Sequence, residues 1–262
     1  MTIRRASTAS GGITLSDEFA LQLEGVSKFF GGLQAVSGVS LAVLPGERRA
    51  LIGPNGAGKT TLFNLISGSL PVSAGTITLF GRDVTGASTH RRAAQGLART
   101  FQITNLFPDL TVLDNCVLAV QALTPTRFAM LRPVGSFAEL RGRARATLEA
   151  VALDAVRDVP VRNLSHGEQR QLEIALALAG RPRVLLLDEP TAGLSPAESR
   201  LMAGLLGRLD PAITVLMIEH DMDIALELSP RVTVLHYGRV IADGSREEIR
   251  ADPQVREIYL GA

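Results

Sequence analysis

A glycine-rich loop constrains the fold of this chain more than any other feature. It lies between the apolar residues 49–52, which predict a short strand, and residues 60–67, whose apolar side chains have helical spacing. The loop and its continuation read Gly53, Pro54, Asn55, Gly56, Ala57, Gly58, Lys59, Thr60 and Thr61. In this context glycines let backbone N–H groups converge on phosphate oxygens, and the amino end of the helix adds positive potential. The pattern therefore predicts a nucleoside triphosphate site in which Lys59 reaches the β and γ phosphates and the Thr60 hydroxyl ligates Mg²⁺, the alternative being a turn with an incidental Gly-Lys-Thr.

A pair of carboxylates follows the most apolar strand candidate. Residues 184–187 are Val-Leu-Leu-Leu, and Asp188 and Glu189 come directly after them. A strand buried on both faces is a poor place for two charges unless something needs them. Asp188 suits the outer shell of Mg²⁺, and Glu189 suits polarising an attacking water. The alternative is a strand end followed by a helix cap.

Residues 164–168, Leu-Ser-His-Gly-Glu, precede a predicted helix at 169–179. Ser165 with Glu168 three residues later has the spacing of a capping box. A hydroxyl and the Gly167 N–H at a helix amino end also make an anion site, and the two interpretations are compatible.

Gln102 and His220 carry weaker signals. Gln102 lies between the phosphate loop and the helical region, where a surface glutamine is the simpler interpretation. His220 follows a predicted strand at 213–218, where a structural histidine is the simpler interpretation. Each gains meaning only beside the other motifs.

Composition describes an ordinary globular chain of 262 residues, 46% apolar and 20% charged. Its length suits one large domain or a domain with a sizeable subdomain. No apolar stretch approaches the roughly 18 residues of a membrane helix, so membrane association is expected through a partner. The net charge of +1 gives no electrostatic reason to propose nucleic acid. Cys116, the single cysteine, excludes an intramolecular disulfide, is expected to be buried, and fits a reducing cytosol.

The order of predicted elements favours an α/β fold with a mainly parallel sheet. Residues 1–18 lack the apolar segment of a secretory signal and predict a flexible tail. Residues 113–156 are poor in strand signals and predict helices inserted into the sheet domain. The remaining expected strands are 21–26, 39–43, 75–80 and a hairpin at 232–243 that turns at Tyr237-Gly238, and the remaining expected helices are 141–153 and 197–209.

Together these motifs resemble the ATP-binding subunits of ABC transporters, from about residue 21 to the end of the chain. The resemblance implies a P-loop NTPase core with an antiparallel β-subdomain near the amino end. It implies an ABC ATPase domain over residues 19–262, with a helical subdomain at about 103–180 and a carboxyl-terminal segment at about 244–262. It also implies ATP and Mg²⁺ as ligands, and a cytoplasmic position on the inner face of the membrane.

The same resemblance assigns roles to single residues. Phe30 would stack on adenine, and Gln102 would sense the γ-phosphate or Mg²⁺. Glu189 would be the catalytic carboxylate and His220 the γ-phosphate switch. The family works as a head-to-tail dimer, so residues 165–167 of one subunit would close over the nucleotide of the other.

A narrower resemblance is to the longer ATPase of branched-chain amino-acid importers. It is carried by residues 29–36, 99–102 and 218–222 and by the ending Tyr-Leu-Gly at 259–261. It implies permease subunits, a second ATPase and, indirectly, a solute-binding protein as partners. His166, Glu168 and Ser195 depart from the commonest family residues. We expect activity nonetheless, with two unequal ATP sites as the alternative.

Three other functions are alternatives to import. An ABC ATPase for export or lipid extraction shares the Tyr-Leu-Gly ending. A non-transport ABC protein acting on ribosomes or DNA typically carries two cassettes or a long coiled-coil insert, and this chain has neither. A nucleotide sensor without hydrolysis is disfavoured by Lys59, Asp188, Glu189 and His220.

Overall fold

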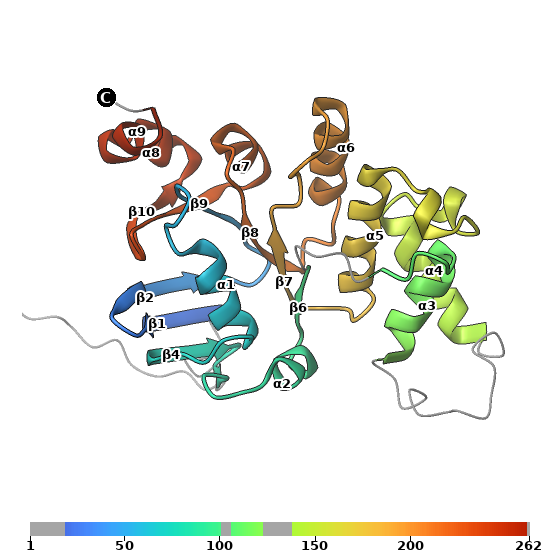
Figure 1. Cartoon of the computed structure of the whole chain (residues 1–262), viewed down its shortest axis with the longest axis horizontal. Helices are drawn as coiled ribbons and strands as arrows, with labels where there is room; N and C mark the ends of the chain where they lie inside the picture. Colours follow the sequence, from blue (N-terminus) through green and yellow to red (C-terminus); the bar gives the residue numbers. More distant parts are fainter. Residues whose placement is uncertain (1–18, 101–105, 123–137, 261–262) are drawn as a thin grey trace, which may run out of the picture.

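A computed structural model describes residues 19–100, 106–122 and 138–260. The predicted tail at 1–18 and Gln102 lie outside these residues. Figure 1 shows a central parallel sheet with an antiparallel sheet on one side and a group of helices at the far end. The predicted α/β class is confirmed.

The antiparallel sheet has the order β2-β1-β4-β5. Its first two strands are longer than the sequence pattern predicted, because they continue through a hairpin in which Phe30 pairs with Leu33. The strands are β1 (Leu21–Phe30), β2 (Leu33–Val43), β4 (Ala74–Leu79) and β5 (Arg82–Asp83).

The second sheet has the order β10-β9-β3-β8-β7-β6, and its strands from β9 to β6 are parallel. The predicted hairpin is present as the antiparallel pair of β9 and β10. The short strand β6 was not predicted, because three residues give too little pattern. The strands are β3 (Arg48–Ile52), β6 (Leu97–Arg99), β7 (Val184–Asp188), β8 (Thr214–Ile218), β9 (Arg231–His236) and β10 (Arg239–Ser245).

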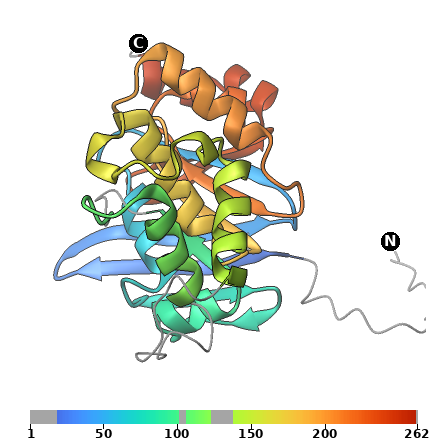
Figure 2. The ribbon, with the colours of Figure 1, turned by 90° about the vertical axis from the view of Figure 1, so that its right-hand side faces the viewer.

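Helices cover the parallel sheet and extend beyond it. In Figures 1 and 2, α3, α4 and α5 gather at the end of the molecule opposite α8 and α9. The α-helices are α1 (Lys59–Ser67), α2 (Thr89–Ala94), α3 (Val112–Ala122), α4 (Ala138–Ala150), α5 (His166–Leu178), α6 (Pro196–Gly207), α7 (Met222–Leu228), α8 (Arg246–Ala251) and α9 (Pro253–Leu260). Short 3₁₀ turns occupy Asp154–Val156 and Val161–Asn163.

The parallel sheet is buried on both faces, as its continuous apolar strands predict. Along β7, Leu185 and Leu187 pack into the core shared with α3 to α6, whereas Val184 and Leu186 pack into the core shared with α1 and the antiparallel sheet. Cys116 is fully buried in the first core, as predicted, and burial raises the pKa of its thiol to about 12. Because both faces of the sheet pack against a hydrophobic core, the ends of its strands, from which the site is built, are held in place.

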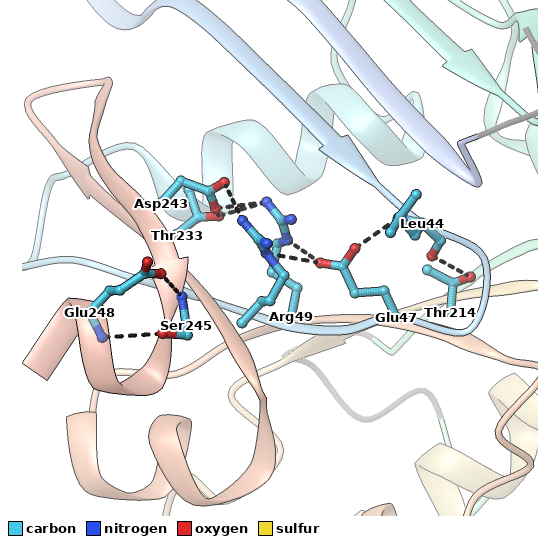
Figure 3. A network of polar contacts seen from close by, with 9 residues as sticks. Leu44, Glu47, Arg49, Thr214, Thr233, Asp243, Ser245 and Glu248 are labelled. Atoms are coloured by element: carbon cyan, nitrogen blue, oxygen red, sulfur yellow. Dashed lines mark hydrogen bonds and ion pairs between the residues drawn. The ribbon is translucent and has the colours of Figure 1, made fainter. Parts of the chain in front are cut away.

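A buried polar network secures the amino end of β3 (Figure 3). The Arg49 guanidinium is 2.6 Å from Glu47 Oε1 and 2.8 Å from Asp243 Oδ1. Thr233 donates its hydroxyl to the same Asp243 oxygen at 2.7 Å, and Glu47 Oε2 accepts the Leu44 N–H at 2.9 Å. The network therefore joins the end of β2 to β3, β9 and β10.

Candidate functional site

The site lies at the carboxyl edge of the parallel sheet. Strands β3, β8, β7 and β6 are parallel neighbours, so the segments that follow them meet at one edge, where ligands of such sheets bind. β3 leads into the glycine-rich loop, β7 into Glu189, β8 into His220, and β6 towards Gln102. The topology brings together the segments that carry the glycine-rich loop, Glu189 and His220.

Two glycines of the loop are required by close contacts. A Cβ on Gly53 would lie 2.2 Å from the Leu235 carbonyl oxygen, and one on Gly58 would lie 2.6 Å from the Ala35 carbonyl oxygen. Gly58 also begins α1 in the left-handed conformation, with φ 99°. Because this helix has no side-chain cap, its first N–H groups are left for a ligand of the loop.

Lys59 is held against its own loop. Its ammonium donates to the carbonyl oxygens of Gly53, at 2.6 Å, and Pro54, at 3.1 Å. Burial lowers its pKa, and the charges of Glu189 and Asp188 partly oppose that change. A lysine so placed is a compact cation directed at an anion-binding loop.

Asp188 is buried at the end of β7 with one oxygen paired and one open. Its Oδ2 is 2.8 Å from the Arg99 guanidinium. Its Oδ1 has no hydrogen-bond partner among the described residues. A buried carboxylate oxygen without a partner is costly and calls for a polar group or cation to approach it.

Glu189 has an uncommon backbone conformation for its residue type. Its φ is 48°, in the left-handed region, and its N–H donates to the Ile218 carbonyl at 3.0 Å. Such a conformation costs on the order of 1–3 kcal/mol and is held by the surrounding structure. It directs Glu189 into the same cavity as Lys59.

That cavity has a volume of about 320 Å³. The first half of β2 and the β9–β10 turn form its other walls. The described residues lining it are Leu33, Gln34, Ala35, Asn55, Gly56, Ala57, Gly58, Lys59, Thr60, Thr61, Glu189, Tyr237 and Gly238. Phe30 is not among these lining residues. It lies beside them, half exposed, with the Lys28 ammonium 5.2 Å from its ring centre.

The capping box at Ser165 is confirmed: Ser165 Oγ accepts the Glu168 N–H, and Glu168 accepts the Ser165 N–H. Neither Ser165 nor Gly167 is among the described residues around the phosphate-loop cavity. Gly167 faces α6 instead, where Glu198 Oε1 lies 3.0 Å from the position of a Cβ on Gly167. Within this chain, then, the segment at 165–167 and the phosphate loop are separate.

His220 is exposed beyond the end of β8, and the preceding residue, Glu219, is fully buried. Thr191 donates its hydroxyl to Glu219 Oε1 at 2.9 Å, and Oε2 lacks a partner within the described part of the chain. Burial raises the pKa of Glu219 to about 7, an effect opposed by the Thr191 bond and increased by the charges of Glu189 and Asp221. Glu219 thus links the segment after Glu189 to the segment that carries His220.

Three residues of this region received no role from sequence reasoning. Arg99 and Glu219 lie within the motifs at residues 99–102 and 218–222, and Tyr237 lies in a predicted turn. For Arg99 and Glu219, a charged residue at the end of a strand was the one sequence feature that could have indicated a role in the site. Tyr237 reaches the cavity through tertiary packing, in which Gly238 N–H donates to the Ala57 carbonyl at 2.9 Å.

A glycine-rich loop on β3, paired carboxylates on β7 and an adjoining helical region define the class of nucleotide-binding ATPases. The sequence matches the family model described as ABC transporter over residues 36–192, and the model described as branched-chain amino acid ATP-binding cassette transporter over 239–262. The chain therefore belongs to the ABC transporter family and is one of its ATP-binding ATPases.

Individual relatives and solved structures support the same family assignment. The chain is 40% identical over 248 residues to the high-affinity branched-chain amino acid transport ATP-binding protein BraF of Pseudomonas aeruginosa, covering 92% of this chain and 97% of that protein. The ADP conformation of an ATP-binding cassette of an ABC transporter matches with a TM-score of 0.82 and 31% identity, covering 93% of this chain and 99% of that one. A dimeric post-hydrolysis cassette bound to ADP and Pi matches with a TM-score of 0.71 and 27% identity, over 86% and 98%.

Among the described residues no helix is long and apolar enough to cross a membrane.

Proposed function

We propose that this chain is the ATP-hydrolysing subunit of an importer of branched-chain amino acids or a related small polar solute. The carboxyl-terminal match at 239–262 and the relative named above support the substrate class. The observation that carries the site itself is the shared cavity of Lys59, Glu189 and the loop residues. An export or lipid-extraction ATPase is the alternative.

In this proposal residues 53–61 bind the phosphates of ATP through backbone N–H groups, and Lys59 supplies the cation at the β and γ phosphates. Phe30, whose strand partner Leu33 lines the cavity, would stack on adenine. Glu189 accepts a proton from the attacking water, and His220 contacts the γ-phosphate.

The residues present fit Mg²⁺. The open Oδ1 of Asp188 and the Thr60 hydroxyl are oxygen donors, and the described residues contain no cluster of three or more His, Cys, Asp or Glu. Mg²⁺ is usually bound by only a few protein ligands together with the phosphates of the substrate. Gln102, outside the described residues, stays a predicted third donor. When bound, Mg²⁺ neutralises charge that develops on the phosphate oxygens.

We propose a head-to-tail dimer in which a partner's segment 165–167 would complete the site, because Ser165 and Gly167 do not line the cavity of their own chain. The dimeric cassette bound to ADP and Pi supports a dimer of such domains. We further propose a helical subdomain at about 103–180, supported by the mutual packing of α3, α4 and α5, and a carboxyl-terminal segment at about 244–262. The cytoplasmic face of the membrane, permease subunits, a second ATPase and a solute-binding protein complete the assembly.

Glu189→Gln tests the catalytic assignment. It should lower turnover by roughly 10²–10⁴-fold, because a general base contributes about that factor, while ATP-dependent dimerisation is retained. Steady-state phosphate release and size-exclusion chromatography with ATP measure the two. The exposed Glu247→Gln is the matched control. Wild-type turnover in Glu189→Gln would remove Glu189 from this role.

The transport assignment needs its own experiment. Purification of the chain with the products of neighbouring genes should recover two permeases, a second ATPase and a binding protein. Vesicles that contain these membrane subunits and enclose ATP should accumulate leucine when leucine and the binding protein are added outside. Recovery with lipid-export or secretion subunits would contradict import without affecting the ATPase assignment.

A further inference from the structure

Arg99 joins three structural elements at the carboxyl edge of the sheet. It ends β6, and its side chain is only 9% exposed. Its Nη2 is 2.8 Å from Asp188 Oδ2 on β7. Its Nη1 donates to Asn64 Oδ1, at 2.6 Å, and to Ser67 Oγ, at 3.2 Å, both on α1.

The same strand end also holds the backbone of Asp188. The Asp188 N–H donates to Thr100 Oγ1 at 3.2 Å, and the Thr100 N–H donates to the Leu186 carbonyl at 3.0 Å. Asp188 is thereby fixed at its amide and at one carboxylate oxygen. A carboxylate held at both points has little freedom to rotate, so its second oxygen keeps one direction.

That second oxygen, Oδ1, is the open one within the described chain. The helix that Arg99 contacts, α1, starts at Lys59 and Thr60 of the phosphate loop. One guanidinium thus ties the carboxylate of β7 to the helix that begins in the phosphate loop.

We propose that Arg99 is a positioning residue for the metal site: it holds Asp188 Oδ2 so that Oδ1 is presented to the Mg²⁺ of bound nucleotide. The proposal rests on the assignment of Asp188 to that ion and does not depend on the transported solute. A planar fork can contact Asp188 and Asn64 together, whereas a lysine ammonium is a single point charge on a flexible stem. Arg99→Lys therefore keeps the charge and loses part of the geometry.

Binding of Mn²⁺, in place of Mg²⁺, to the complex of the full chain with ADP gives a readout independent of turnover. Electron paramagnetic resonance measures free Mn²⁺, and ADP affinity is measured separately in EDTA. Arg99→Met should raise the Mn²⁺ dissociation constant at least fivefold, Arg99→Lys should fall between it and wild type, and ADP affinity in EDTA should stay within twofold. Arg183→Met is the matched control. Both arginines pack on a phenylalanine, Arg99 with its guanidinium 5.7 Å from the Phe63 ring centre and Arg183 with its guanidinium 3.3 Å from the Phe80 ring centre, but Arg183 lies at the other end of β7 from Asp188.

Two further variants separate the possible failures. Asp188→Asn leaving Mn²⁺ affinity unchanged would overturn the metal assignment itself. Weakened binding in Asp188→Asn with wild-type binding in both Arg99 variants would overturn only the positioning role. If Arg99→Met does not fold, Asn64→Ala and Arg99→Lys together test the proposal. Asn64→Ala removes the contact of Arg99 with α1, so we expect it to weaken Mn²⁺ binding in the same direction but less. Wild-type Mn²⁺ affinity in both variants would contradict the proposal.

Discussion

Two buried arginines pair with aspartates near opposite ends of the parallel sheet, and they differ in what surrounds the carboxylates. At the amino end, Arg49 binds Glu47 and Asp243, and each oxygen of those two carboxylates has a partner: Arg49, Thr233, Arg231 or the Leu44 N–H. At the carboxyl edge, Arg99 binds one oxygen of Asp188 and the other stays open within the described chain.

The difference distinguishes a buried polar cluster that serves folding from one that is arranged for a ligand. Burying charge is tolerable for folding when each polar atom is paired, as around Arg49. The carboxyl edge instead holds two open carboxylate oxygens, on Asp188 and Glu219, and a left-handed Glu189. We interpret this edge as less than optimal for stability because it is arranged for a ligand.

Arg49→Met should give the largest change in stability. It leaves Glu47 and Asp243 buried or half-buried without their cation, which costs about 3–5 kcal/mol of unfolding free energy. Urea denaturation measures the loss, and the exposed Arg239→Met is the control. The affinity of the folded fraction for ADP should not change; a lost affinity with unchanged stability would reverse the comparison between the two ends.

Glu219→Gln should increase stability at high pH. The folded state raises the pKa of Glu219 from 4.5 to about 7, so the native protein favours the protonated form. The stabilising contribution of Glu219, measured relative to the Glu219→Gln variant, is therefore fully present below pH 4.5 and is lost as pH rises through 7. Above that pH the deficit amounts to about 3 kcal/mol.

Unfolding free energies of wild type and Glu219→Gln at pH 5.5 and 8.5 check this, with the exposed Glu227→Gln as control. The gap between wild type and Glu219→Gln should widen from the lower pH to the higher. An equal gap at both values would mean that Glu219 is ionised in the folded protein at both.

Lys59→Ala should weaken ATP binding by about 1.5–3 kcal/mol, the range for hydrogen bonds to charged groups. Stability without nucleotide should change less than in Arg49→Met, because the hydrogen bonds of Lys59 to other described residues go to carbonyls of its own loop. Equilibrium binding of a fluorescent ATP analogue measures the affinity, with Arg250→Ala as control. Unchanged affinity would remove Lys59 from the phosphate site.

The sequence predicted the motifs at the carboxyl edge of the sheet better than the contacts that join them. The loop at residues 53–60, the strand before Asp188 and the cap at Ser165 follow local rules of spacing, and each was found where expected. The roles of Arg99 and Glu219 depend on partners 89 and 28 residues away, which no local pattern reveals. Strand β6 was missed for the same reason, since three residues gain their conformation from pairing with β7.

The amino-end network was also beyond sequence reasoning. Arg49 stood in a predicted strand, and no local pattern gave its charge a role. Its burial is explained by Glu47, two residues away, together with Asp243, 194 residues later in the chain. Phe30 shows a different limit: its motif was recognisable, but its position next to Leu33 of the cavity wall depends on the register of the β1–β2 hairpin.

The most direct test of the contrast between the two ends is the Mg²⁺-dependent part of the thermal shift produced by ADP, measured in wild type, Asp243→Asn and Asp188→Asn. We expect Asp243→Asn to unfold at a lower temperature but to keep the wild-type increment on adding Mg²⁺ to the ADP complex. Asp188→Asn should lose most of that increment. An increment that is lost in Asp243→Asn and retained in Asp188→Asn would contradict the account.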